Sequence, residues 1–175
     1  MNLDSVRDVH EVLASRGLAP KKRWGQNFLV DRNVRSAIAD LVTAGPGERA
    51  WEVGPGLGAL SELLLDRGVE LVVFEIDHGL VSFLREHFAD YENLTVVAGD
   101  VVEQWPKHSE ASKPPQCVLG NLPYSSAAPI IASFLQSNVA TRQFVFMVQE
   151  EVAERMIAGP NTRTYSAFTV LVQSR

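Results

Sequence analysis

The chain has 175 residues, enough for one domain with a hydrophobic core and too few for two domains of ordinary size. Apolar residues make up 46% of the sequence and charged residues 21%, which is typical of globular proteins and not of disordered ones. No apolar run is long enough to cross a bilayer. The single cysteine, Cys117, excludes an internal disulfide and is expected to be a buried thiol in a reducing cytosol.

The net charge of −5 counts against a nucleic-acid partner when it is considered as a sum. The basic residues are nevertheless concentrated near the N-terminus, at Arg16, Lys21, Lys22, Arg23, Arg32 and Arg35. On charge alone, a solvated helix face is the simpler interpretation of this cluster.

β-rich runs alternate with helical patterns along the chain, which predicts an α/β fold with a doubly wound, Rossmann-like parallel sheet. We interpret residues 1–32 as a basic segment leading into the fold and 33–175 as the domain. Strands are expected at 49–53, 70–75, 94–98, 116–120 and 143–148. Helices are expected at 33–44 after an Asp31 cap, and at 59–67, 78–87, 129–136 and 150–157. The run 164–173 is ambiguous and we favour a helix, whereas the proline-rich stretch 105–115 is predicted to be a surface loop.

A glycine-rich loop follows the first predicted strand. Gly54, Gly56 and Ala59 occupy the three positions of the dinucleotide-binding fingerprint, where small residues allow the backbone to turn sharply and approach a ligand. The loop alone does not separate a nicotinamide cofactor from S-adenosylmethionine, and a tight turn without a ligand is the alternative.

Acidic residues end the next two strands. Glu75 lies about twenty residues beyond the loop, where a carboxylate can accept hydrogen bonds from both ribose hydroxyls. Its alternative role is a helix N-cap, for which Asp77 is the better candidate. Asp100 follows the third strand and can reach the exocyclic amine of an adenine, although a capping or turn role is about as plausible.

The fourth strand ends in Asn121, Leu122, Pro123 and Tyr124, the most specific motif in the chain. An adenine amine is a poor nucleophile, and two acceptors aimed at its hydrogens would stabilise the positive charge that develops on methyl transfer. The Asn121 side-chain oxygen and the Leu122 carbonyl, held by the following Pro123, could supply them. Tyr124 offers a flat face on which an extruded base can stack.

In combination, these motifs and the segment Gly25-Gln26-Asn27-Phe28-Leu29-Val30-Asp31 resemble the ribosomal RNA adenine N6,N6-dimethyltransferase family, from about Lys21 to Gln173. Within it, the motifs are most similar to those of the bacterial small-subunit branch linked to kasugamycin sensitivity. The resemblance implies a class I methyltransferase domain that binds S-adenosyl-L-methionine. It also implies dimethylation of two adjacent adenines near the 3′ end of 16S rRNA in the 30S particle, in the cytoplasm, without a membrane or a metal.

The resemblance also implies roles for single residues. It places Asn27 and Leu29 at the methionine end of the cofactor, with Gly54 beneath the same region. It assigns Glu75 to the ribose, Asp100 to the adenine, and Asn121 to both the cofactor and the target amine. It further implies that the basic N-terminal cluster contacts RNA.

The chain departs from the family pattern in two places. Ser125, Ser126 and Ala127 stand where the family usually has Asn, Ile and then Ser or Thr. The family also continues past the position of Arg175 through two further strands and a small helical domain, which we expect to be absent here.

Four alternative interpretations of the sequence compete with that of an adenine dimethyltransferase. The related enzymes that methylate large-subunit rRNA and confer macrolide resistance share every motif. A non-catalytic ribosome-assembly or transcription factor would be expected to lose the Asn-Leu-Pro-Tyr acceptors or the acids. A nicotinamide oxidoreductase would leave residues 121–124 without a purpose. A metal enzyme is disfavoured because the four histidines show no ligand spacing with one another or with Cys117.

Overall fold

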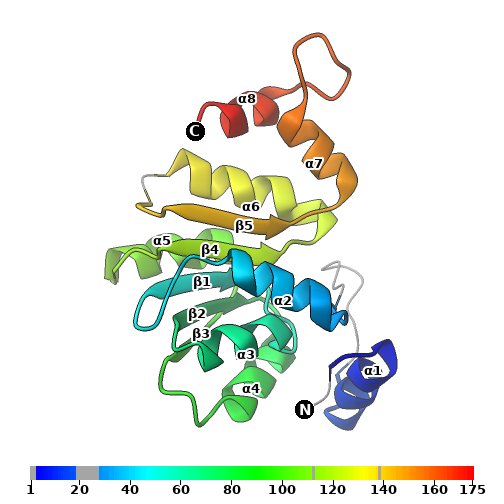
Figure 1. The fold of residues 1–175 in the computed structure, drawn as a ribbon, viewed down its shortest axis with the longest axis vertical. Helices are drawn as coiled ribbons and strands as arrows, with labels where there is room; N and C mark the ends of the chain where they lie inside the picture. The colour runs from blue at the N-terminus through cyan, green and yellow to red at the C-terminus, as the bar shows by residue number, and fades with distance from the viewer. Residues whose placement is uncertain (1–2, 19–27, 112, 138) are drawn as a thin grey trace.

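The structure is a computed structural model that describes residues 3–18, 28–111, 113–137 and 139–175. Its centre is a five-stranded sheet with the order β3-β2-β1-β4-β5, in which every neighbouring pair is parallel (Figure 1). The strands are β1 (Arg49–Val53), β2 (Glu70–Glu75), β3 (Leu94–Ala98), β4 (Cys117–Asn121) and β5 (Gln143–Met147). The predicted doubly wound α/β class is confirmed, and every predicted strand is present to within one residue at each end.

Helices cover both faces of this sheet (Figure 1). They are α1 (Val6–Ser15), α2 (Arg32–Leu41), α3 (Ala59–Asp66), α4 (His78–His87), α5 (Val101–Ala111), α6 (Tyr124–Gln136), α7 (Glu150–Ile157) and α8 (Ala167–Gln173). Within the described ranges, no helix combines the length and the apolar character needed to span a membrane.

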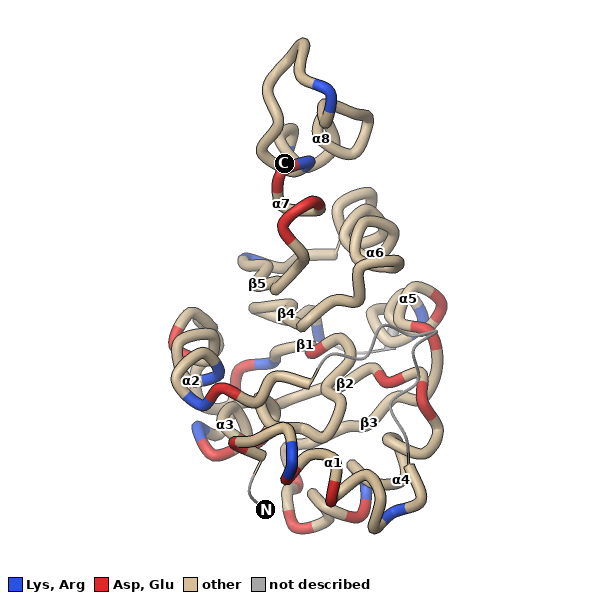
Figure 2. Tube along the Cα trace, turned by 90° about the vertical axis from the view of Figure 1, so that its right-hand side faces the viewer, with Lys and Arg blue, Asp and Glu red and all other residues tan. Residues whose placement is uncertain are grey.

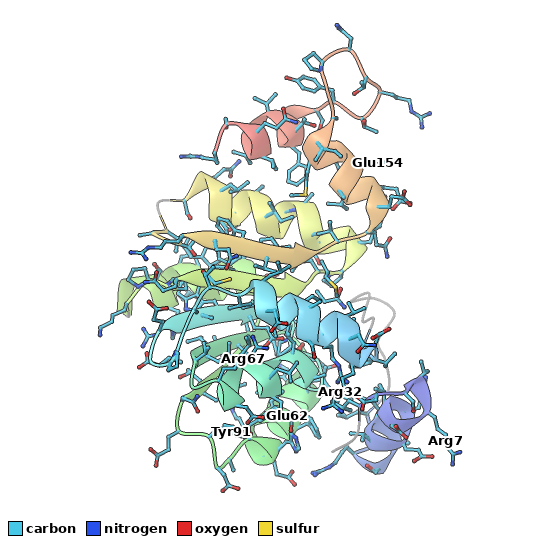
Figure 3. All side chains as sticks on the ribbon, in the orientation of Figure 1. Arg7, Arg32, Glu62, Arg67, Tyr91 and Glu154 are labelled. Atoms are coloured by element: carbon cyan, nitrogen blue, oxygen red, sulfur yellow. The ribbon has the colours of Figure 1, made fainter. Side chains whose placement is uncertain are left out.

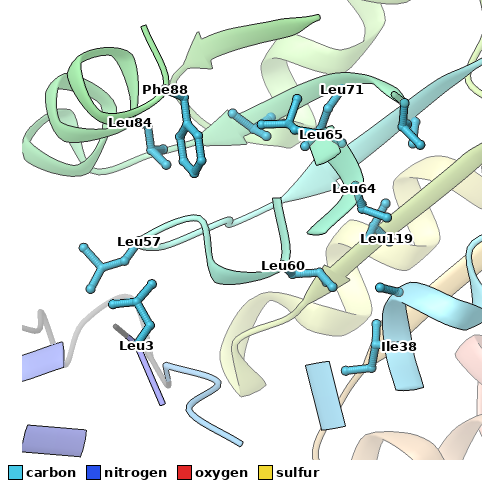
Figure 4. Packing of buried hydrophobic residues seen from close by; sticks show 14 of the residues in the cluster. Leu3, Ile38, Leu57, Leu60, Leu64, Leu65, Leu71, Leu84, Phe88 and Leu119 are labelled. Carbon is cyan, nitrogen blue, oxygen red and sulfur yellow. The ribbon is translucent and has the colours of Figure 1, made fainter. Parts of the chain in front are cut away.

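The strands alternate their side chains between two hydrophobic cores. On one face, Leu71, Leu119 and their neighbours pack against α1 to α4. Figure 4 shows part of this core, including Ile38 of α2, Leu64 of α3 and Leu84 of α4. On the other face, Trp51 and Phe74 pack against α5 and α6, and the same core reaches α7 and α8. The central strands β1, β2 and β4 are therefore buried on both sides, which explains their nearly continuous apolar sequences.

The prediction of a loop at 105–115 is wrong, because α5 occupies most of that stretch. The helix begins after Asp100, whose side chain accepts a hydrogen bond from the Val102 amide at 2.9 Å. Trp105 is buried against Phe134, and its indole NH donates to the Ser133 hydroxyl at 2.9 Å. This packing outweighs the hydrogen bond that Pro106, inside the helix, cannot make.

The helix predicted at 129–136 begins five residues earlier, at Tyr124. The backbone amides of Ser126 and Ala127 both donate to the Pro123 carbonyl and close the first turn. Pro129 lies inside the helix and does not start it. The extension makes Tyr124, the last residue of the predicted Asn-Leu-Pro-Tyr motif, the first residue of α6.

The start and the end of α2 both have clear physical causes. Asp31 caps α2 as predicted, but the helix ends at Leu41 and not at residue 44. The Gln143 side chain from β5 donates to the Leu41 carbonyl at 2.7 Å and accepts from the Thr43 amide at 3.0 Å, which stops the helix. The ambiguous run 164–173 is helical from residue 167 onward, which confirms the choice of helix over strand.

The N-terminal segment contains a helix, α1, that was not predicted. Ser5 caps it by accepting a hydrogen bond from the Asp8 amide at 3.1 Å, and Val9 and Leu13 bury its apolar face against the core. The capping serine and the helical spacing of these apolar residues were the signal in the sequence.

Candidate active site

A cavity of about 290 Å³ lies at the carboxyl edge of the sheet. The strand order changes direction between β1 and β4, and parallel sheets bind ligands at such a switch point. Five of the six residues predicted to hold the cofactor line this cavity: Leu29, Gly54, Glu75, Asp100 and Asn121. The sixth, Asn27, lies outside the described residues.

The glycine loop forms the floor of the cavity after β1. Gly54, Gly56 and Gly58 all have positive φ angles, of 67°, 60° and 79°, a conformation that residues with a side chain rarely adopt. The Gly54 amide donates to the Phe74 carbonyl at 2.9 Å, which ties the loop to β2. A side chain at Gly58 would also overlap the ring of Phe88. The loop is thus fixed in a shape that exposes backbone to the cavity.

Glu75 ends β2 and is only 4% exposed. One carboxylate oxygen accepts from the Asp77 amide at 2.9 Å, and the other lies 3.4 Å from the Gly56 amide, which donates to it. Burial raises the pKa of this carboxyl, and the two amides lower it. Asp77 caps α4 by accepting from the Gly79 amide at 2.8 Å, as predicted. Glu75 is therefore free of the capping role and braces the glycine loop while it lines the cavity.

Asp100 lies beyond β3, where it caps a helix, as the sequence allowed, and also lines the cavity. Its Oδ1 atom accepts from the Val102 amide at 2.9 Å, so it starts α5. The same residue is exposed and lines the cavity next to Val101 and Ile76. These neighbouring apolar side chains offer surfaces that can pack against a flat ring.

The Asn-Leu-Pro-Tyr motif bridges β4 and α6 at the far side of the cavity. Asn121 and Pro123 line the cavity, as do Ser125 and Ser126. The Leu122 side chain turns into the core, and its amide donates to the Met147 carbonyl at 2.9 Å. The Tyr124 side chain is 55% exposed and lies outside the cavity wall. The motif thus sets an amide at the cavity and an accessible aromatic ring beside it.

Sequence reasoning gave no role to Glu52, which the structure places in the cavity wall. This residue lies in β1, is 3% exposed and accepts a hydrogen bond from the Ser61 hydroxyl at 2.5 Å. Leu3 and Val9 were also missed, because the helix α1 that brings them to the cavity was not predicted. An acidic residue between the apolar Trp51 and Val53 was the signal for Glu52 in the sequence.

The ionisable side chains that line the cavity are all acidic within the described part of the chain. They are the carboxyl groups of Glu52, Glu75 and Asp100, and no lysine, arginine or histidine among the described residues lines the cavity. The side of the cavity formed by the end of β4 and the start of α6 carries no charged residue, and both elements are tan in Figure 2. An anionic ligand such as a pyrophosphate would therefore be repelled, whereas a cationic ligand would be stabilised.

The residues of the basic N-terminal cluster have different environments in the structure. Arg35 is 6% exposed and is paired with Asp4, so it cannot contact a partner molecule. Arg16 pairs with both oxygens of Glu86 on α4 at 2.7 Å. Arg32 is exposed at the start of α2, near the carboxyl edge of the sheet (Figure 3). Lys21, Lys22 and Arg23 lie outside the described residues.

Other chemistry-bearing residues lie apart from the cavity. Cys117 is buried in β4 as predicted, and burial raises the pKa of its thiol to about 12. Across the described ranges, no group of three or more histidine, cysteine, aspartate or glutamate side chains is placed to hold a metal ion.

The sequence of the chain also matches a known protein family and named proteins. Residues 17–175 match the sequence model of the family described as ribosomal RNA adenine dimethylase. The chain is 41% identical over 172 residues to a protein of Treponema denticola named ribosomal RNA small subunit methyltransferase A, covering 97% of this chain and 59% of that protein. It therefore spans about three-fifths of the length of that relative.

Solved structures share the same arrangement. A dimethyladenosine transferase from Plasmodium falciparum superposes with a TM-score of 0.69 at 24% identity, covering 84% of this chain and 52% of the other. The 23S rRNA methyltransferase ErmE superposes with a TM-score of 0.63 at 29% identity, covering 82% and 56%. The first of these likenesses concerns the fold alone.

Proposed function

Because the chain belongs to the ribosomal RNA adenine dimethylase family, we propose that it transfers methyl groups from S-adenosylmethionine to N6 of adenines in ribosomal RNA. The observation that carries this proposal is the order of side chains along the carboxyl edge of the sheet. Asp100 after β3, Glu75 on β2, Gly54 after β1 and Asn121 on β4 follow one another in the order of the strands. An adenosine ligand extended along this edge would meet them as adenine, ribose, methionine end and transfer site.

The residues present fit such a cofactor. Glu75 is buried at the centre of the edge, where its carboxylate can accept from ribose hydroxyls. Ile76 and Val101 give apolar contacts beside Asp100. The cofactor would supply an electrophilic methyl group on a sulfonium, a positive charge that suits a cavity lined by carboxyl groups. A nicotinamide dinucleotide would instead bring a pyrophosphate into the same acidic surroundings.

The acceptor side fits an adenine amine. The Asn121 side-chain oxygen and the Leu122 carbonyl would accept from the two amine hydrogens and stabilise the charge that develops on nitrogen. After transfer the nitrogen loses a proton, and neighbouring oxygen atoms can pass it to water. Tyr124, exposed at the rim, would stack on the base. Ser125 and Ser126 would flank the base with small hydroxyl groups.

We further propose that the substrate is small-subunit rRNA, namely two adjacent adenines near its 3′ end within the 30S particle in the cytoplasm. The support is the identity of 41% over 172 residues to a protein named for the small subunit. The exposed Arg32 at the start of α2 offers a phosphate contact. The sequence adds Lys21, Lys22 and Arg23, which lie outside the described residues.

The test is mass spectrometry of adenines in small subunits from a strain that lacks this methylation, incubated with the protein and S-adenosylmethionine. We expect N6,N6-dimethyladenosine in the small-subunit rRNA, and none with the Asn121→Ala variant. Large subunits from a strain without the corresponding modification serve as the second substrate. Methylation of the large subunit alone would contradict the small-subunit assignment, and absence of methylation on both would contradict the enzymatic one.

A further inference from the structure

Glu52 is a buried carboxyl group that the proposed methyl transfer does not use. It is 3% exposed, lies on the face of β1 that packs against α3, and lines the cavity near the glycine loop. Its carboxyl group accepts a hydrogen bond from the Ser61 hydroxyl of α3, and Ser61 is itself fully buried. A buried carboxylate is costly unless a positive charge or several donors compensate it.

The groups around Glu52 do not provide that compensation. Glu75 on the neighbouring strand β2 is a second carboxyl, and the facing residue of β4, Leu119, is apolar. The buried cation of α2, Arg35, is paired with Asp4 and does not line the cavity. Among the described lining residues there is no cation. Within the described part of the chain, the wall therefore presents carboxyl groups to the cavity without a positive charge to compensate them.

We propose that Glu52 is a proton-linked counter-ion of the cofactor: its carboxyl group carries a proton in the empty cavity and releases it to solvent when the positive charges of S-adenosylmethionine enter. The proposal rests on the proposed function, which names this cofactor. The step balances simply, since the O–H bond of the carboxyl breaks, the proton goes to water, and the carboxylate stays beside the bound cation.

The acid–base properties of the site agree with this assignment. The pKa of the Glu52 carboxyl is raised to about 7: burial is the main cause, the Ser61 hydroxyl opposes it, and the nearby Glu75 adds to it. A bound cation lowers the pKa, because it stabilises the charged form. Since the complex then holds fewer protons than the empty protein, cofactor affinity must rise with pH until it levels off above about 7.

The experiment is calorimetric titration of S-adenosylmethionine at about pH 6, in two buffers with different ionisation enthalpies. The difference in observed heat gives the number of protons released. We expect about one more proton from the wild type than from Glu52→Gln, and an affinity that falls by up to about tenfold per pH unit below 7 only where Glu52 is present. The exposed carboxyl Glu103 gives the matched control, and Glu103→Gln should behave as the wild type.

A second ligand and a second variant extend the test. 5′-Methylthioadenosine keeps the adenosine and lacks the cationic end, so its binding should release no proton from Glu52. Ser61→Ala removes the donor that stabilises the carboxylate, so the pH at which affinity levels off should move upward. This second variant also tests the proposal if Glu52→Gln does not fold.

The outcomes separate the two proposals. Binding of S-adenosylmethionine with equal proton release by the wild type and Glu52→Gln would overturn the role of Glu52 and leave the proposed function intact. An unchanged pH profile in Ser61→Ala would also overturn it. No binding of S-adenosylmethionine by the folded wild type would overturn both.

Discussion

Glu75 does two tasks with one carboxylate. It accepts from the amides of Asp77 and Gly56, and so it holds the glycine loop while its position on the cavity suits a ribose. Its carboxyl group was recognisable from the sequence because it ends a strand about twenty residues after the loop. Its bracing role was not, because the hydrogen bond to Gly56 depends on the folded shape of the loop.

Glu75→Gln keeps one oxygen acceptor but removes the negative charge. We expect binding of S-adenosylmethionine to weaken by about 1.5–3 kcal/mol, the range for a hydrogen bond to a charged group. Calorimetry measures this loss, and circular dichroism verifies that the variant is folded. Unchanged affinity in a folded variant would remove Glu75 from the binding site.

Glu52 should make the stability of the empty protein depend on pH. Its pKa rises from 4.5 in the unfolded chain to about 7 in the folded protein, so the folded protein binds more protons between these values. This contribution to stability is present below pH 4.5 and is lost as the pH rises through 7. Glu52→Gln should therefore be more stable than the wild type at pH 8, by about 3 kcal/mol at most, with a smaller difference at pH 5. Urea unfolding at both values checks it, and an equal difference at the two pH values would contradict it.

Substitutions of Asn121 and Tyr124, the residues proposed for the transfer site, should have different effects. Asn121→Ala removes an acceptor that matters most as charge develops on the amine, so turnover should fall more than RNA affinity. Tyr124→Phe should be mild and Tyr124→Ala severe, because stacking requires the ring and not the hydroxyl. Single-turnover rates and RNA binding measured on each variant test these effects. Equal losses in rate and affinity for Asn121→Ala would contradict the assignment.

At the scale of elements, strands were predictable and several helices were not. Each strand is a short run of apolar residues flanked by turn residues, and burial on both faces leaves little ambiguity. The two misplaced helices, α5 and α6, each contain a proline that suggested a loop or a helix start. Packing of Trp105 in α5 and the capping carbonyl of Pro123 in α6 decided the outcome, and neither is local information in the sequence.

Helix α1 links an unpredicted element to the cavity. Val9 lines the cavity, and Leu13, one turn later, anchors the helix in the core with 2% of its surface exposed. Leu13→Ala should weaken the docking of α1 by about 2–5 kcal/mol, because it removes a buried side chain. We expect faster hydrogen exchange in α1 and weaker cofactor binding. Val6→Ala, at an exposed position of the same helix, is the control and should change neither. Normal affinity together with faster exchange would show that α1 does not contribute to binding.

At the scale of the whole molecule, the parallel sheet brings together residues that lie far apart in the sequence. The carboxyl ends of β3, β2, β1 and β4 form one edge, so Asp100, Glu75, Gly54 and Asn121 meet at a single cavity. Because this consequence of parallel strand order is general, most of the site could be predicted without a structure. The acidic character of the cavity could not be predicted in this way, because it depends on the fold keeping the described basic residues out of the cavity lining.

The acidic lining of the cavity should determine which adenosine ligand binds, and calorimetric comparison of two ligands tests this directly. The chain would be titrated at about pH 8 with S-adenosylmethionine and, separately, with NAD⁺ at the same concentrations. Both ligands carry an adenosine, but one brings a positively charged end and the other a pyrophosphate. We predict binding of one S-adenosylmethionine per chain and no measurable heat with NAD⁺. Binding of NAD⁺ without binding of S-adenosylmethionine would contradict the account.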